Sequence, residues 1–203
     1  TGFHTSAMCS TTRAALLTGR NHHSVGMGCL ANFDSGFPGY RGKIARESGT
    51  LAEMLRPHAY RNYMVGKWHV TPLTETGPTG PFDGWPLGRG FDRFYGHLHT
   101  NTNYYKHTRE GGHDLQEDGK PVQAGGEYLT HLEAREAVRF IRERDPVKPF
   151  FLYVPDGAPP GGSWTQAARQ TFSKDGKLNP LAAVTGVFGY VRGMFKAFPE
   201  PMK

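Results

Sequence analysis

Cys9 and Arg13 are the first two residues in the chain whose types and spacing suggest chemistry. Residues four positions apart share a helix face, so a helix that begins next to Cys9 places its thiol beside the guanidinium. Gly19 is a common helix stop, and good N-cap residues follow Cys9 directly, namely Ser10, Thr11 and Thr12. These signals predict a helix over about residues 11–18, whose first turn presents unpaired N–H groups. Together the three features predict a site for a tetrahedral oxyanion.

Lys67 and His69 form a second pair, at the end of a strand that we predict over residues 60–65. Positions two apart in a strand point to the same side of the sheet, so an ammonium and an imidazole would face one cavity. The ammonium can hold an anionic oxygen as a point charge, and the imidazole can act as a general base. We therefore expect both side chains to converge on Cys9, although they are far from it in the sequence.

Several stretches resemble segments of the sulfatase family. The stretch Cys9–Gly19 is similar to the signature C-x-P-x-R followed by a few residues and L-T-G, and the residues through Gly28 resemble the arylsulfatase branch. Gly-Lys-Trp-His at residues 66–69 and Gly-Phe-Asp-Arg-Phe-Tyr-Gly at 90–96 are similar to two further segments. A lone Cys-x-x-x-Arg occurs often by chance, so the resemblance depends on these longer matches. Cys-dependent phosphatases separate Cys from Arg by more residues than this chain does, which excludes that class.

The resemblance implies that the formylglycine-generating enzyme converts Cys9 to formylglycine. The hydrated aldehyde would attack the sulfur of a sulfate-ester small molecule, and its second hydroxyl would let the covalent intermediate collapse. Arg13 would fix and polarise this residue, Lys67 would bind the sulfate, and His69 would orient or deprotonate the formylglycine. A divalent cation, calcium or else magnesium, is also implied, with Cys9 as formylglycine among its oxygen ligands.

Two departures from the family pattern leave other functions open. Thr11 stands where the signature has the proline that the converting enzyme reads. The family's paired metal-binding aspartates would lie upstream of Thr1. The remaining ligands of the divalent cation are therefore absent from this sequence. The alternative is therefore a catalytically inactive, truncated sulfatase-like fragment that is at most an anion binder. A phosphate-ester hydrolase of the same superfamily is a third hypothesis, which Cys9 disfavours because the usual nucleophile there is Ser or Thr.

Composition sets the broad class of the protein. The chain has 203 residues, 37% of them hydrophobic, with 27 Gly and 15 Pro, which is enough for one loop-rich globular domain. A net charge of +6 favours anionic partners, but no long basic run indicates nucleic-acid binding and no apolar run predicts a membrane span. Cys9 and Cys29 are too few for a disulfide framework. The histidines at 97, 99, 107 and 113 match no zinc spacing.

The elements that position the candidate residues alternate between helix and strand. Capping boxes at Thr50–Glu53 and Thr130–Glu133 predict helices that begin there, the second over residues 130–144. Phe150–Val154 is an apolar run typical of a buried parallel strand, and residues 21–43 are expected to form a long loop along one wall of the pocket. This order predicts an α/β fold with a mainly parallel sheet and helices on both faces. The resemblance implies an alkaline-phosphatase-like fold that is incomplete here.

The resemblance also divides the chain near residue 160. Residues 1–160 resemble part of a sulfatase catalytic domain, whereas residues 161–203 form a divergent C-terminal tail without resemblance. In the family, a substrate-contacting histidine follows the last of these strands, and Pro160 or a neighbour stands in its place here.

Overall fold

The computed structural model of the protein describes residues 5–6, 8–100, 102–109 and 112–155. The predicted boundary near residue 160, Pro160 and the tail 161–203 lie outside the described residues.

A five-stranded sheet in the order β6-β5-β2-β1-β7 forms the centre of the described part. Its parallel strands are β1 (Arg61–Lys67), β2 (Arg93–His97) and β7 (Phe150–Tyr153), with β1 in the middle. Two short strands extend the β2 side in antiparallel pairing, β5 (Gln116–Glu117) and β6 (Lys120–Pro121). A separate two-stranded ladder joins β3 (Thr108–Arg109) to β4 (Gly112–His113). The sheet is thus mainly parallel, as the alternation of elements predicts.

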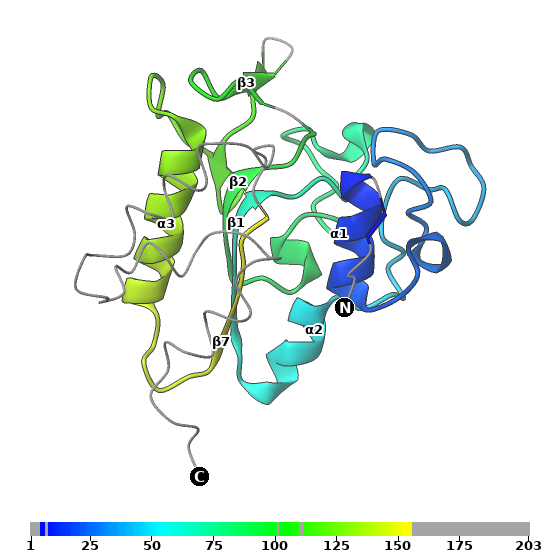
Figure 1. Ribbon diagram of the computed structural model, residues 1–203, viewed down its shortest axis with the longest axis horizontal. Coiled ribbons are helices and arrows are strands. Elements are labelled where there is room, and N and C mark those ends of the chain that lie inside the picture. The colour runs from blue at the N-terminus through cyan, green and yellow to red at the C-terminus, as the bar shows by residue number, and fades with distance from the viewer. Residues whose placement is uncertain (1–4, 7, 101, 110–111, 156–203) are drawn as a thin grey trace.

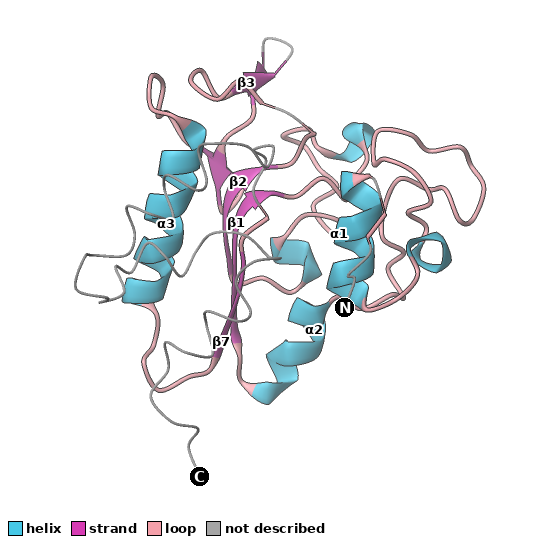
Figure 2. Ribbon diagram, viewed as in Figure 1, coloured by secondary structure: helices cyan, strands magenta, loops and turns pink. Residues whose placement is uncertain are grey.

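Helices cover both faces of this sheet, as Figure 1 and Figure 2 show. The helix α3 (Leu129–Glu143) lies on one face, and α1 (Cys9–Thr18) and α2 (Leu51–Leu55) lie on the other. Short 3-10 helices occur in the connections: η1 (His22–Val25), η2 (Arg56–His58), η3 (Leu73–Glu75) and η4 (Leu87–Arg89). This arrangement is the predicted α/β architecture with helices on both faces.

Alternating residues of the central strands supply two hydrophobic cores. Met64 and Phe94 belong to the core under α1 and α2, whereas Val65 and Tyr95 belong to the core under α3. All four are buried, as expected for parallel strands covered on both faces. Burial of each such side chain contributes roughly 1.5–3 kcal/mol to the free energy of folding. Packing in both cores therefore holds β1, and with it the end of the strand at Lys67, in place.

Gly66 interrupts this alternation one residue before the end of β1. Its φ of 119° lies in a region that L side chains rarely adopt, and a Cβ there would meet the carbonyl oxygen of Pro155 at 2.6 Å. The same Cβ would lie 3.7 Å from Oε1 of Glu133 on α3, so positions 65 and 66 both face α3. Lys67 therefore returns to the α1 face, which simple alternation from Val65 would not allow.

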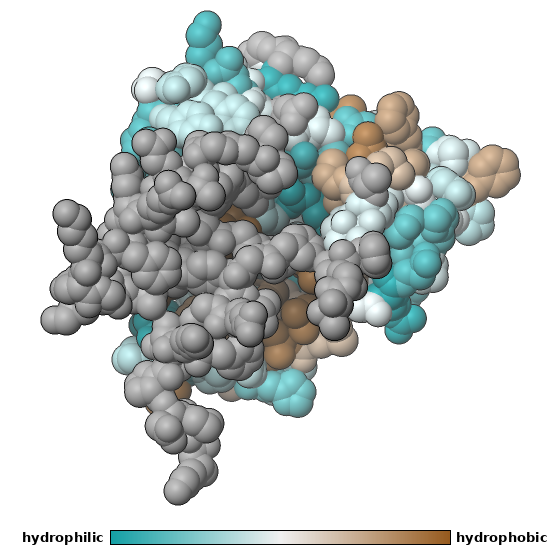
Figure 3. Space-filling model, in the orientation of Figure 1, coloured by the Kyte–Doolittle hydropathy of each residue, from teal (hydrophilic) through white to brown (hydrophobic). Residues whose placement is uncertain are grey.

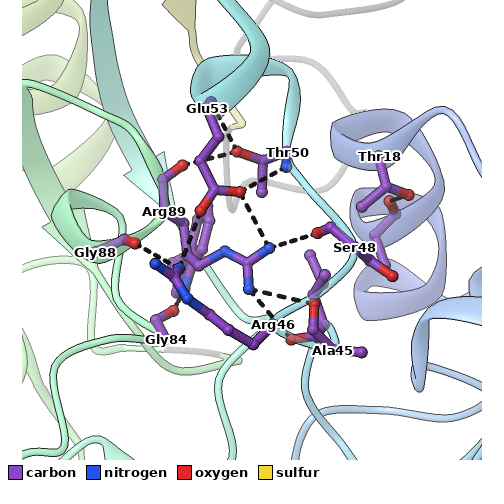
Figure 4. A network of polar contacts seen from close by, with 12 residues as sticks. Thr18, Ala45, Arg46, Ser48, Thr50, Glu53, Gly84, Gly88 and Arg89 are labelled. Carbon is purple, nitrogen blue, oxygen red and sulfur yellow. Dashed lines mark hydrogen bonds and ion pairs between the residues drawn. The ribbon is translucent and has the colours of Figure 1, made fainter. Parts of the chain in front are cut away.

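The predicted capping box at α2 is confirmed, and a buried arginine anchors it (Figure 4). Thr50 accepts a hydrogen bond from the Glu53 backbone, and Glu53 accepts one from the Thr50 backbone. Arg89, only 3% exposed, donates to Glu53 Oε2 at 3.2 Å and to the carbonyl of Ser48 at 2.6 Å. Arg46 binds the other carboxylate oxygen of Glu53 at 3.0 Å. These bonds join α2 to the segments before it and to η4.

The predicted capping box at Thr130 and Glu133 is wrong. The helix α3 begins at Leu129, and its N-cap Tyr128 makes no side-chain capping bond. Glu133 is buried against the sheet instead, with its Oε1 3.7 Å from Nδ1 of His97 at the end of β2. Its carboxylate thus lies between α3 and the sheet. A local sequence pattern cannot distinguish a glutamate in this position from one that caps its own helix.

The stretch 21–43 is largely the loop that the sequence predicts, with η1 near its start and an isolated bridge between Met27 and Tyr40. Val25 and Met27 within it are fully buried, so the loop is packed onto α1. Phe33 and Phe37 are 63% and 70% exposed, and hydrophobic surface shows at the right-hand edge of Figure 3, where this loop lies. In the described part of the chain, no helix has the length and hydrophobicity that crossing a bilayer requires.

Candidate active site

Cys9 lies at the N-terminus of α1, as predicted, although the helix begins at Cys9 itself rather than near residue 11, and Gly19 ends it in a left-handed conformation. The predicted N-caps are wrong, since the N-cap is Met8 and no side chain caps the helix. The hydroxyl of Thr11, buried in the first turn, donates to the carbonyl of Met8 at 2.9 Å. Thr12 donates to the carbonyl of Ser6 at 2.8 Å. These hydroxyls therefore bind carbonyls upstream of the helix rather than its free N–H groups.

His69 lies against Cys9 and is held from its far side. Its Nδ1 is 3.1 Å from the sulfur of Cys9 and 3.2 Å from the hydroxyl of Ser10. Its Nε2 is 2.7 Å from Oδ1 of Asn32, an acceptor, so Nε2 carries the proton and Nδ1 presents its lone pair. The Ser10 hydroxyl accepts from the backbone N–H of Ala31 at 3.1 Å and can donate to Nδ1. His69 is thus oriented as a base toward the Cys9 position.

Lys67 meets the same sulfur from the end of β1. Its side chain hydrogen-bonds with Cys9, and it is buried at 7% exposure. Burial lowers the pKa of Lys67, and the neighbouring Arg13 lowers it further, whereas Cys9 acts in the opposite direction. The favourable partner for this buried ammonium is therefore a negative charge at the Cys9 position.

Arg13 connects α1 to the ends of two strands. Its Nη1 donates to the carbonyl of Lys67 at 2.6 Å, and its side chain hydrogen-bonds with Tyr153 at the end of β7. Cys9 and Arg13 thus both contact Lys67, which confirms that they share the face of α1 that meets the sheet. Arg13 is placed to hold the backbone of Lys67, a contact that the sequence pattern did not indicate.

The convergence of Lys67 and His69 on Cys9 is confirmed, but the predicted reason for it is wrong. The strand β1 ends at Lys67, and His69 has a left-handed φ of 51° beyond the strand. Strand alternation therefore does not align the two side chains. The glycine conformation at Gly66 directs Lys67 to the α1 face, and the turn at His69 brings the imidazole back to the same place.

The electrostatic environment of the site is strongly positive. Burial, together with the charges of Lys67 and Arg13, lowers the pKa of His69 to about 3. The same three causes lower the pKa of the fully buried His97 to about 3. Arg109, in β3, also lowers the pKa values of Lys67 and His69, so its charge reaches the site. At neutral pH the site therefore combines a neutral imidazole with three cations, which suits an anionic ligand.

The residues around Cys9 do not fit a divalent cation. Over the described ranges, no group of three or more His, Cys, Asp or Glu side chains could hold a metal ion. The charged groups that act on His69 are cationic, namely Lys67, Arg13 and Arg109. Calcium and magnesium bind through clusters of oxygen ligands, which this set does not supply.

The sequence patterns did not predict a role in the site for three residues. Asn32 lies in the predicted loop, and Ser10 appeared only as a capping candidate. Arg109 lies on a strand of only two residues that carries no pattern. His22 and His23 lie in η1, where His22 binds the carbonyl of Met27 at 3.0 Å. The contacts of Asn32 and Ser10 with His69 carry no sequence signal, because each joins segments far apart in the chain.

A family model of the sulfatases matches residues 1–159. The chain therefore belongs to the sulfatase family, and its fold is the alkaline-phosphatase-like fold of that family. It is 30% identical over 183 residues to an uncharacterised sulfatase of Schizosaccharomyces pombe, a match that covers 78% of this chain and 31% of that protein. It is 27% identical to arylsulfatase J of Mus musculus, over 75% of this chain and 25% of that enzyme.

Two solved structures have a fold similar to that of this chain. The crystal structure of Ps i-CgsB matches with a TM-score of 0.58 and 25% identity, over 93% of this chain and 43% of that one. The structure of BT4656 in complex with its substrate D-glucosamine-2-N,6-O-disulfate matches with a TM-score of 0.52 and 25% identity, over 81% and 27% of the two chains. The chain thus spans less than half the length of these relatives.

Proposed function

We propose that this chain carries the sulfate-binding and nucleophile-bearing part of a sulfuric ester hydrolase of the arylsulfatase type. The observation that carries the proposal is the 3.1 Å approach of His69 Nδ1 to the sulfur of Cys9, next to the buried ammonium of Lys67. The sulfur marks the position that a formylglycine hydroxyl would occupy after conversion of Cys9. Membership of the sulfatase family supports this assignment.

Each residue then has a defined task. A hydroxyl of the hydrated formylglycine attacks the ester sulfur, a new O–S bond forms as the ester S–O bond breaks, and the proton of that hydroxyl passes to the departing alcohol. His69 Nδ1 then takes the proton of the remaining hydroxyl, the aldehyde reforms as its C–O bond to the sulfate breaks, sulfate leaves with that electron pair, and water hydrates the aldehyde again. Lys67 holds the sulfate oxygens by charge, and Arg13 holds the carbonyl of Lys67 and adds positive charge. Asn32 keeps the lone pair of His69 at Nδ1.

The substrate class and the cofactor are proposed from membership of the family. We propose a small sulfate ester as the substrate class, supported by relatives named arylsulfatase in Mus musculus and Klebsiella aerogenes. The formylglycine-generating enzyme would be the partner that converts Cys9. Calcium or magnesium is the cofactor that membership of the family leads us to expect, and the described residues supply no carboxylate cluster for it.

A second candidate is an inactive anion binder of the same fold. It is favoured by Thr11, which occupies the second position after Cys9 and is committed to the Met8 carbonyl, and by the missing carboxylate cluster among the described residues. In that case Lys67, Arg13 and the start of α1 bind sulfate without turning it over.

Conversion of Cys9 separates the two candidates. The chain is co-produced with the formylglycine-generating enzyme, and the peptide that contains Cys9 is analysed by mass spectrometry. The hydrolase proposal predicts the mass of formylglycine at this position and none in a Cys9→Ala control. Unmodified cysteine in every molecule would overturn the hydrolase and leave the anion binder. Thr11→Pro, which restores the family pattern, shows whether the assay can detect conversion in this chain.

A further inference from the structure

Cys9, His69 and Asn32 form a continuous series of side-chain contacts. Nδ1 of His69 is 3.1 Å from the sulfur of Cys9, and Nε2 of the same ring is 2.7 Å from Oδ1 of Asn32. The imidazole thus lies between a thiol and an amide oxygen, with a different nitrogen facing each. A nucleophile within reach of a base, which a third group orients, is the arrangement of covalent catalysis, and papain-like proteases use the set Cys-His-Asn.

Lys67 and the start of α1 provide a place for negative charge at the same sulfur. The side chain of Lys67 is buried and hydrogen-bonds with Cys9. Cys9 is also the first residue of α1, where backbone N–H groups and the helix dipole attract an anion. The thiolate is the nucleophilic form of cysteine, so these contacts suit a reactive sulfur. A negative sulfur would in turn offset the cations that disfavour a charged His69.

Cys29 is a second free cysteine and offers a comparison within the molecule. It is half-buried, as Cys9 is, but its sulfur lies 3.4 Å from the carbonyl oxygen of Phe33 and 3.6 Å from that of Leu30. A carbonyl oxygen accepts a hydrogen bond from a thiol but does not act as a base toward it. The neighbours of the two sulfurs, rather than their burial, therefore distinguish Cys9 as a nucleophile.

We propose that Cys9, where it has not been converted, is the nucleophile of a Cys-His-Asn triad that hydrolyses small carboxylic esters. The sulfur attacks the carbonyl carbon, Nδ1 of His69 takes the thiol proton, the ester C–O bond breaks, and the alcohol leaves with that proton. Water then attacks the thioester, Nδ1 takes its proton, the C–S bond breaks, and the proton returns to the sulfur as the carboxylic acid leaves. Lys67 and the start of α1 hold the negative carbonyl oxygen. Asn32 is a positioning residue that keeps the lone pair of the ring at Nδ1.

This activity goes beyond the proposed hydrolysis of sulfate esters, because it belongs to cysteine at position 9 rather than to formylglycine. A chain produced without the formylglycine-generating enzyme carries only the cysteine form, so the two activities can be measured separately. Absence of conversion would end the sulfatase proposal and leave this inference intact. Absence of thiol reactivity would do the reverse.

The test uses the unconverted 203-residue chain and para-nitrophenyl acetate as the ester. Absorbance measures the release of nitrophenolate, and mass spectrometry of peptides locates the acetyl group. We expect an initial burst, acetyl on Cys9, and continued turnover as the thioester is hydrolysed. Cys29→Ala should behave like the wild type, and Cys9→Ala should lose the burst. His69→Ala should be acetylated at least about a hundredfold more slowly, since a general base contributes roughly 10²–10⁴-fold to the rate.

Acetylation of Cys9 no faster than that of Cys29 would overturn the inference, as would an unchanged rate in His69→Ala. An acetyl group that stays on Cys9 would overturn the hydrolytic step. Asn32→Ala should slow acetylation about tenfold, and Asn32→Asp, which keeps the acceptor, should restore most of the rate. If His69→Ala fails to fold by circular dichroism, alkylation of the wild type decides. Iodoacetate should then react at least about tenfold faster with Cys9 than with Cys29, because cations favour both the thiolate and this anionic reagent. Equal alkylation rates would contradict the triad.

Discussion

Oδ1 of Asn32 lies 2.7 Å from Nε2 of His69, on the opposite side of the imidazole from Cys9. This contact fixes the tautomer in which Nδ1 accepts a proton. Burial and the adjacent cations lower the pKa of His69 to about 3, so the ring is neutral under ordinary conditions and its tautomer decides what it can do. Asn32 is therefore the residue that makes His69 a base toward the nucleophile.

Asn32→Ala should allow the imidazole of His69 to adopt both tautomers. Nitrogen NMR of the labelled imidazole is expected to show Nε2–H in the wild type and a mixture of both tautomers in the variant. Asn32→Asp also accepts at this position and should keep Nε2–H. A wild-type spectrum with the proton on Nδ1 would contradict the assigned role of His69.

Gly66→Ala should disrupt the site from the end of β1. Alanine is strained at a φ of 119°, and its Cβ would meet the carbonyl oxygen of Pro155 at 2.6 Å. We expect a loss of unfolding free energy on the order of 1–3 kcal/mol, together with displacement of Lys67 from Cys9. Thermal unfolding measures the first effect, and sulfate binding measures the second.

Gly49→Ala is the matched control for that substitution, because a Cβ at Gly49 meets nothing within 4 Å. It should leave the unfolding free energy nearly unchanged or slightly higher. If Gly66→Ala behaves like this control, Gly66 does not direct Lys67 to the α1 face.

Asp114 should make stability depend on pH. Burial raises the pKa of Asp114 from 3.8 to about 6, so the folded state binds its proton more tightly than the unfolded state. The raised pKa of Asp114 makes a contribution to the free energy of unfolding that is fully present below about pH 4. This contribution is lost as the pH rises through 6, a change of roughly 3 kcal/mol. Asp114→Asn should therefore gain stability relative to the wild type between those pH values, as measured by urea unfolding. Asp83→Asn, at an exposed position, controls for the loss of one carboxylate. A constant difference between wild type and Asp114→Asn across this range would exclude the effect.

Local patterns predicted the elements that depend on local forces. The Gly19 stop, the spacing of Cys9 and Arg13, and the Thr50–Glu53 box each act within a few residues, and the structure has the expected helices there. The apolar run from Phe150 likewise forms a parallel strand next to β1, but within the described residues β7 is an edge strand whose first three residues are half-buried, so the expected full burial is wrong. Helix spacing and capping act over a few residues, so the sequence alone indicates them.

Contacts between distant segments could not be predicted in this way. The same Thr-x-x-Glu pattern caps α2 but not α3, because Glu133 is buried near His97. The Asn32–His69 contact joins a loop to a strand end, and neither partner carries a periodic signal. Lys67 and His69 reach Cys9 through backbone conformations at Gly66 and His69, so the correct prediction rested on an incorrect mechanism.

The isolated 203-residue chain should hydrolyse sulfate esters weakly or not at all, even when Cys9 is converted. The described residues place no carboxylate cluster at the site, and loss of such electrostatic stabilisation costs on the order of 2.7–4 kcal/mol per donor. A chromogenic aryl sulfate in the presence of calcium measures this activity. Robust turnover that Cys9→Ala abolishes would contradict this prediction and show that other residues of the chain hold a cation.

Titration of the chain with inorganic sulfate tests the central claim, that Cys9, Lys67 and His69 form one oxyanion site. Calorimetry should detect binding by the wild type and a loss of at least about tenfold in Lys67→Ala, since a charge-assisted contact disappears. Lys120→Ala, at an exposed position on β6, removes the same charge elsewhere and should bind like the wild type. Equal affinity in all three proteins, or no binding by the wild type, would contradict the account.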